Sequence, residues 1–97
     1  MKTKEQYIHL LSEFQKLRGP VYGITRIGIF GLVGRGEQKE GSDVDICYEG
    51  EPLSLFRLAA LKEELETTLE SPVDIVRIRK SMNQLLERRI KRDGLYV

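Results

Sequence analysis

The sequence predicts an α/β (α+β) fold in which helices flank a small mixed β-sheet. Segments with the apolar spacing of helices alternate with short runs rich in β-branched residues, in the order α-β-β-α-β-α. The first two strands are joined by a loop, which allows an antiparallel pair beside the parallel pairing that a helical connection produces. The chain has 97 residues without repeats or a linker, so we expect residues 1–97 to form a single domain.

The first element is a helix that carries its own start and stop signals. Thr3 and Gln6 have the spacing of a capping box, in which each side chain bonds the backbone N–H of the other residue. Gly19 and Pro20 end this helix, and a strand is expected at residues 24–31. The apolar positions expected on one face of the helix are Tyr7, Leu10, Leu11, Phe14 and Leu17.

A glycine-rich loop at residues 31–42 leads to the second strand, which we expect at 43–48. The sequence Glu49-Gly50-Glu51-Pro52 closes that strand, and a helix is expected at 54–69. The positions of this helix that we expect to face inward are Leu55, Leu58, Leu61, Leu65 and Leu69.

The last third of the chain predicts a strand, a helix and a short edge strand. Ser71 and Pro72 break the preceding helix, and the third strand is expected at 73–78. A second capping box, from Ser81 to Gln84, predicts the start of a helix that ends near Gly94. Residues 95–97 have the composition of a short edge strand. The apolar positions of the helix are Met82, Leu85, Leu86 and Ile90.

Composition and charge exclude several classes of protein. A net charge of +1 gives no overall attraction to nucleic acid or to an anionic membrane, and the longest apolar stretch is too short to span one. Cys47 is the single cysteine and cannot form an internal disulfide, so we expect a cytoplasmic protein and a thiol that packs in the core. His9 lies off the apolar stripe of its helix, and we expect it in solvent.

Three aspartates are the candidate catalytic and metal-binding residues. Asp43 and Asp45 are two apart on a strand, so their side chains project to the same face. A divalent cation would offset their repulsion, and carboxylate oxygens suit Mg²⁺ or Mn²⁺. Asp74 lies in a short apolar strand, where a charge needs a purpose. If the two strands are neighbours, the three carboxylates meet in a site for phosphoryl transfer; otherwise the pair is a common feature of exposed strand ends.

The loop after the first strand is a candidate phosphate site. Gly31, Gly34 and Gly36 would let backbone N–H groups approach phosphate oxygens, and Arg35 could add a charge-assisted contact. The loop is not a P-loop, because Glu37 stands where that motif requires lysine. Turns also need glycine, so the loop alone is weak evidence for a nucleotide.

Taken together, these motifs resemble those of the nucleotidyltransferase superfamily that includes DNA polymerase β. The run Phe30-Gly31-Leu32, ten residues and Asp43-Val44-Asp45 has the spacing of the family's Gly-Ser and Asp-x-Asp pattern. Asp74 stands where the family has a third carboxylate on a later strand. Arg35-Gly36-Glu37, Gly41-Ser42 and residues 87–94 are similar to the small bacterial and archaeal members, the minimal nucleotidyltransferases. The likeness covers nearly the whole chain and implies the nucleotidyltransferase fold.

The resemblance implies an antitoxin that transfers AMP from ATP to a tyrosine of a partner HEPN-domain toxin. It implies that Asp43 and Asp45 bind the metal and that Asp74 is the third carboxylate, which acts on the acceptor hydroxyl. The nucleotide-binding residues that it implies are Gly31, Leu32, Arg35 and Ser42.

Leu32 departs from the family pattern, which has serine at this position. Loss of one hydrogen bond to a charged group costs about 1.5–3 kcal/mol, and leucine also adds bulk beside the nucleotide. Two hypotheses therefore stay open: a working transferase, and a catalytically weak or inactive antitoxin that neutralises its partner by binding alone.

A third reading is a nucleic-acid site on the cations near the end of the last helix, Arg88, Arg89, Lys91 and Arg92. Cations at a helix C-terminus are also favoured by the helix dipole, so we do not expect nucleic acid as a partner. The residues do not fix nucleotide specificity, the acceptor, the oligomeric state or the order of the strands.

Overall fold

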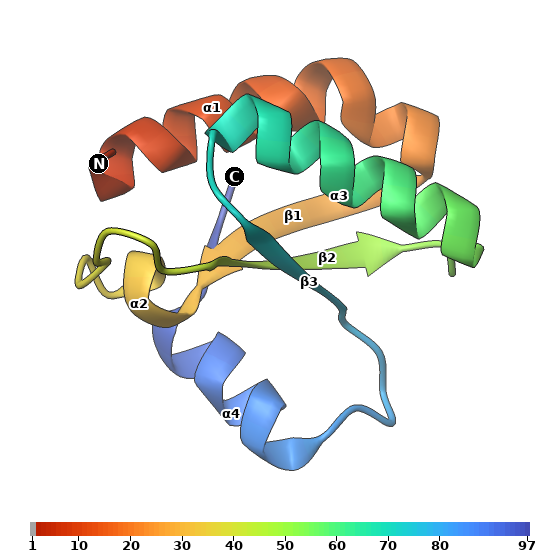
Figure 1. Ribbon diagram of the computed structural model, residues 1–97. Coiled ribbons are helices and arrows are strands. Elements are labelled where there is room, and N and C mark those ends of the chain that lie inside the picture. The colour runs from red at the N-terminus through yellow and green to blue at the C-terminus, as the bar shows by residue number, and fades with distance from the viewer. Residues whose placement is uncertain (1) are drawn as a thin grey trace.

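The computed structural model describes residues 2–97 as one four-stranded sheet with helices on both faces (Figure 1). The predicted order of helices and strands is confirmed. The elements are α1 (Lys4–Arg18), the 3₁₀ turn η1 (Gly19–Tyr22), β1 (Ile24–Phe30), α2 (Gly31–Gly34), β2 (Val44–Gly50), α3 (Leu55–Leu69), β3 (Val73–Arg77), α4 (Gln84–Asp93) and β4 (Leu95–Tyr96).

The strand order is β3-β2-β1-β4, and the sheet is mixed as predicted. β1 pairs antiparallel with β2 and with β4, whereas β2 and β3 run parallel because the helix α3 connects them. The short edge strand expected at the C-terminal end is confirmed by β4, whose Leu95 lies opposite Ile29 of β1. The strand β3 forms the opposite edge of the sheet.

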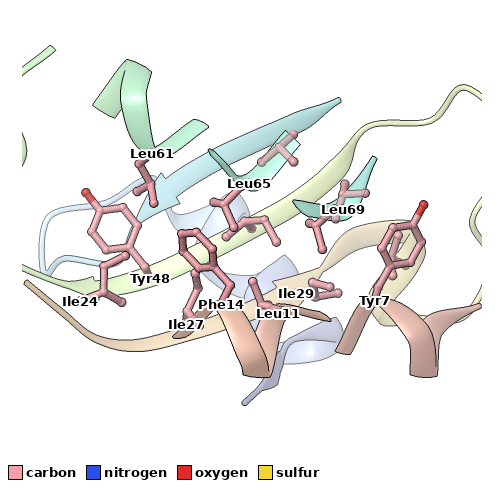
Figure 2. Close-up of a cluster of buried hydrophobic side chains, with 14 of the residues drawn as sticks. Tyr7, Leu11, Phe14, Ile24, Ile27, Ile29, Tyr48, Leu61, Leu65 and Leu69 are labelled. Carbon is pink, nitrogen blue, oxygen red and sulfur yellow. The ribbon is translucent and has the colours of Figure 1, made fainter. Parts of the chain in front are cut away.

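The larger hydrophobic core lies between the sheet and helices α1 and α3, which cover one face together (Figures 1 and 2). Leu11 from α1 and Leu61, Leu65 and Leu69 from α3 are fully buried in it. On the other face α4 packs over a smaller cluster made of Phe30, Cys47 and Ile90. A sheet residue faces one core or the other by its position along the strand, since side chains alternate between the faces.

Three leucines predicted to face inward are exposed: Leu17 by 74%, Leu55 by 84% and Leu85 by 69%. Each lies in the first or last turn of its helix. We attribute their exposure to this position, because a terminal turn extends past the strands that the helix covers. The helical spacing correctly identified the face, but it does not show where the sheet beneath it ends.

The helix starts confirm one predicted cap and correct another. The Thr3–Gln6 capping box is present, with both of its backbone-to-side-chain hydrogen bonds formed. The box predicted from Ser81 to Gln84 is wrong, since Asn83 caps α4 by accepting hydrogen bonds from the N–H groups of Leu85 and Leu86. The loop expected at 31–42 begins with the single helical turn of α2.

Candidate active site

Asp45 and Asp74 are side by side on the face of the sheet that α4 covers. β2 and β3 are neighbours, and their register places Asp45 beside Asp74. Val44 and Ile46, on either side of Asp45, belong to the core on the opposite face. The condition set by the sequence, that the two strands be neighbours with their carboxylates on one face, is therefore confirmed.

The charge environment of Asp45 shows that the third carboxylate is also close. Burial raises the pKa of Asp45, the nearby Arg89 partly opposes this, and the negative charges of Asp74 and Asp43 raise the pKa further. Asp43 and Asp74 are exposed, while Asp45 is partly buried. Ionised Asp45 is thus held in surroundings that disfavour its charge, and a cation would relieve this.

The three carboxylates do not by themselves form a ready-made coordination shell. Within residues 2–97, no group of three Asp, Glu, His or Cys side chains is placed to hold a metal ion. Arg89 instead supplies the positive charge near Asp45, with Nη2 lying 3.7 Å from Oδ2. Coordination of one ion by Asp43, Asp45 and Asp74 accordingly stays a prediction.

Gly31 is needed because of the space that Asp45 occupies. It has a φ of +68°, in the left-handed region that disfavours residues with a side chain. A Cβ at this position would overlap Oδ2 of Asp45. The sequence explained this glycine by the approach of a phosphate, whereas the structure adds a direct reason: its bare Cα makes room for the carboxylate.

A cleft of about 550 Å³ opens between α2, the loop that follows it and the start of β2. It brings together six of the seven predicted site residues: Gly31, Leu32, Arg35, Ser42, Asp43 and Asp45. Leu32 lies in this lining as a half-buried residue. Asp74 is not part of the lining and stands beside it on the edge strand β3.

Two residues of α4, Arg89 and Asp93, also line the cleft, and neither was among the predicted nucleotide-binding or catalytic residues. They are four positions apart and therefore lie on the same side of the helix. A signal for Asp93 was available, because a carboxylate in the last turn of a helix opposes the helix dipole and needs another reason to be there. Arg89 had no such signal, since cations are expected near that end.

Asp93 connects α4 to the glycine-rich turn. Its side chain is only 2% exposed, and it accepts two hydrogen bonds of 3.0 Å from Arg92. Nη1 of Arg35 lies 3.8 Å from Oδ2 of Asp93, and a Cβ on Gly34 would overlap the Asp93 carbonyl oxygen. The hydrogen bonds from Arg92 hold the pKa of Asp93 below its usual value. The carboxylate is thus a fixed negative charge beneath Arg35.

The remaining candidates behave as structural or solvated residues. Burial raises the pKa of the Cys47 thiol to about 11, so it is a protonated core residue as predicted. His9 is exposed. Lys91 pairs with Glu87 and Arg92 with Asp93, so these cations have acidic partners within the chain. Within residues 2–97, no helix has the length and apolar composition needed to cross a membrane.

Comparison with known proteins agrees with this geometry. The polymerase beta nucleotidyltransferase family matches residues 5–97. The protein adenylyltransferase MntA of Thermococcus cleftensis is 36% identical over 98 residues, which cover 100% of this chain and 98% of that protein.

Two solved structures are similar as well. A toxin–antitoxin with AMP-PNP has a TM-score of 0.70 and 26% identity, with 96% of this chain and 70% of that chain covered. A tri-AMPylated Shewanella oneidensis HEPN toxin in complex with an MNT antitoxin has a TM-score of 0.65 and 24% identity, with coverage of 94% and 70%, and shares the fold. The matched family, the paired carboxylates and the glycine beside them together show that this chain belongs to the polymerase beta nucleotidyltransferase family.

Proposed function

We propose that this chain transfers AMP from ATP to a tyrosine hydroxyl of a HEPN-domain toxin, in a reaction that needs Mg²⁺ or Mn²⁺, and so acts as an antitoxin. The observation that carries the proposal is the register of Asp45 and Asp74 on adjacent strands beside the cleft. The name of the Thermococcus relative supports adenylyl transfer, and the complex with AMP-PNP supports an adenine nucleotide. We infer the HEPN partner from the resemblance of the motifs to the minimal nucleotidyltransferases. We infer a cytoplasmic location from the single thiol of Cys47.

The residues around Asp45 fit a divalent ion. Carboxylate oxygens are hard ligands, and Asp43 and Asp45 would supply them, with Asp74 nearby. Gly31 has no side chain and so leaves room for the Asp45 carboxylate. Burial and the negative charges of Asp74 and Asp43 raise the pKa of Asp45, and these surroundings favour a bound cation. When bound, the ion would neutralise charge on the triphosphate and lower the pKa of the acceptor hydroxyl.

The cleft would hold the triphosphate. Arg35 lines the cleft between two carboxylates, with Glu37 Oε2 3.4 Å from its Nε and Asp93 Oδ2 3.8 Å from its Nη1, and its guanidinium would contact phosphate oxygens. Ser42 also lines the cleft and directly precedes Asp43. Leu32 would contact the nucleotide through its backbone and its apolar side chain, without the hydroxyl of the family pattern.

Asp74 would receive the proton of the acceptor. It is exposed on the edge strand beside the cleft, so a tyrosine from another molecule can approach it from solvent. The tyrosine oxygen attacks the α-phosphorus of ATP, a new O–P bond forms, the bond to the β-phosphate oxygen breaks, and pyrophosphate leaves. The hydroxyl proton passes to the Asp74 carboxylate.

The second candidate function is neutralisation of the toxin by binding alone, which the half-buried Leu32 in the cleft favours. The two candidates differ in whether the carboxylates matter. In a binding module Asp43→Asn leaves neutralisation intact, whereas in an enzyme it removes neutralisation together with transfer.

The test is to incubate the chain with Mg²⁺, labelled ATP and the HEPN protein encoded beside it, and to measure label on the partner. We expect Asp43→Asn to lower transfer by at least about a hundredfold. Glu40→Gln is the matched control, since it removes one exposed negative charge three residues away and outside the cleft. Leu32→Ser is expected to raise transfer.

A second measurement does not depend on turnover. Mn²⁺ should raise the unfolding temperature of the wild type and of Glu40→Gln, but not that of Asp43→Asn, because a ligand stabilises only a folded chain that binds it. Unlabelled partner at every metal concentration, together with intact neutralisation by Asp43→Asn, would establish the binding module instead.

A further inference from the structure

Arg89 is held in the cleft by contacts of two different kinds. Its guanidinium lies 5.7 Å from the centre of the Phe30 ring, within the range of a cation–π contact. Its Nη2 lies 3.7 Å from Oδ2 of Asp45, and the side chain is half exposed. Phe30 directly precedes Gly31, so the arginine lies next to the glycine and the aspartate that define the site.

The pair between Arg89 and Asp45 is looser than the pairs that Arg18, Arg26 and Arg92 make with their carboxylates. A separation of 3.7 Å is attractive but too long for a hydrogen bond. Arg92 donates two hydrogen bonds of 3.0 Å to Asp93, and Arg18 donates one of 2.8 Å to Glu64. The guanidinium of Arg89 can therefore leave its carboxylate without breaking a hydrogen bond, unlike those of Arg18 and Arg92.

The same oxygen of Asp45 faces both Arg89 and the bare Cα of Gly31. A divalent ion bound to Asp45 would repel the guanidinium and replace it as the countercharge. The freed guanidinium stays over Phe30 and lines the cleft that contains Arg35. A planar guanidinium with paired donors is complementary to phosphate oxygens, so the cleft then presents two arginines to an anion.

We propose that Arg89 exchanges partners: it neutralises Asp45 when the site holds no metal, and it binds a phosphate oxygen of the nucleotide once a divalent ion takes its place. This assigns to Arg89 a role in nucleotide binding and rests on the proposed function of the cleft. The exchange predicts effects of opposite sign on the two ligands, which a bracing role on Phe30 does not.

The experiment measures binding to Arg89→Gln by calorimetry, without any acceptor. ATP in the presence of Mg²⁺ should bind about 10- to 100-fold more weakly than to the wild type, since one charge-assisted hydrogen bond is lost. Mn²⁺ alone should bind about two- to tenfold more tightly, since a competing cation is removed. Arg89→Lys keeps the charge but loses the planar fork, so its affinity for Mn²⁺ should match the wild type while that for ATP is only partly restored.

Arg88→Gln is the matched control. It removes the same charge from the adjacent residue, which is exposed and does not line the cleft, and it should bind both ligands as the wild type does. Unchanged ATP affinity in Arg89→Gln, or a change of the same sign for ATP and Mn²⁺, overturns the exchange while leaving the proposed function in place. A wild type that binds neither ligand overturns both.

Discussion

The two faces of the sheet are built for different purposes. The face under α1 and α3 has a continuous core in which Leu11, Leu61 and Leu65 are completely buried (Figure 2). The face under α4 has three buried core residues, and beyond them it carries Asp45, Arg89 and Asp93.

The difference shows how a chain of this size can contain a site that lowers its folding stability. Charged groups that crowd one another reduce stability, and a small domain has little stability to lose. Here the hydrophobic burial is concentrated on the face without the carboxylates. The other face can then hold like charges and an arginine pair that is not fully bonded.

The sharpest test of this comparison is a cavity on each face. Leu65→Ala removes a fully buried side chain from the larger core and should cost about 2–5 kcal/mol of unfolding free energy. Ile90→Ala in the smaller cluster should cost less, since fewer buried neighbours surround it and it is 5% exposed. Urea denaturation of the two variants provides the comparison, and equal losses would show that the faces contribute alike.

A smaller loss is expected from Asp93→Asn, with a dependence on pH that identifies its cause. The hydrogen bonds from Arg92 hold the pKa of Asp93 below 3.8, the ordinary value. A lowered folded pKa gives stability that is present above the unfolded pKa and is lost as pH falls through the folded one. The variant should therefore be less stable than the wild type at pH 7, and the two should converge below pH 3.8. A constant difference across this range would mean that charge is not the cause.

Asp45→Asn should stabilise the folded chain at pH 7, whereas Asp93→Asn should destabilise it. Burial and the charges of Asp74 and Asp43 raise the pKa of Asp45 above 3.8, so its ionised form opposes folding. Removing one of two like charges on neighbouring strands should increase stability by about 0.2–1 kcal/mol at pH 7, with no gain below pH 3.8. The same variant should lose transfer. Thermal unfolding at both pH values tests this, and a destabilised Asn variant would show that Arg89 outweighs the repulsion.

The smallest effect is expected at an exposed apolar residue. Leu55→Ser should change stability by less than about 0.5 kcal/mol, because Leu55 is 84% exposed at the start of α3. Leu61→Ser, six residues along the same helix and fully buried, is the matched comparison and should be strongly destabilising. Urea midpoints of the two variants decide whether terminal turns lie outside the core.

The sequence predicted features that depend on local pattern. Helical spacing and β-branched runs identified every main helix and strand, and the alternation along β2 placed Asp45 opposite the larger core. The strand order could not be derived, because the partner of a strand is chosen by contacts between residues far apart in the chain. The convergence of Asp45 and Asp74 depended on that order.

The same limit explains what was missed in the site. Arg89 and Asp93 acquire their roles from the position of α4 against α2 and β1, which the sequence of residues 84–93 does not reveal. The place of Asp93 in the last turn of α4 was the one local signal. The local pattern also wrongly predicted that Leu17 and Leu85 are buried, since it cannot show where a neighbouring element ends.

The overlap between a Cβ at position 31 and Oδ2 of Asp45 also constrains how this chain can diverge. Position 31 cannot accept a larger residue while Asp45 keeps its place, because the added Cβ would displace the carboxylate. In a lineage that loses the catalytic activity, Asp45 would be replaced by a smaller residue before Gly31 is replaced by a larger one. The order of those two changes in a lineage would record when its site ceased to be under selection.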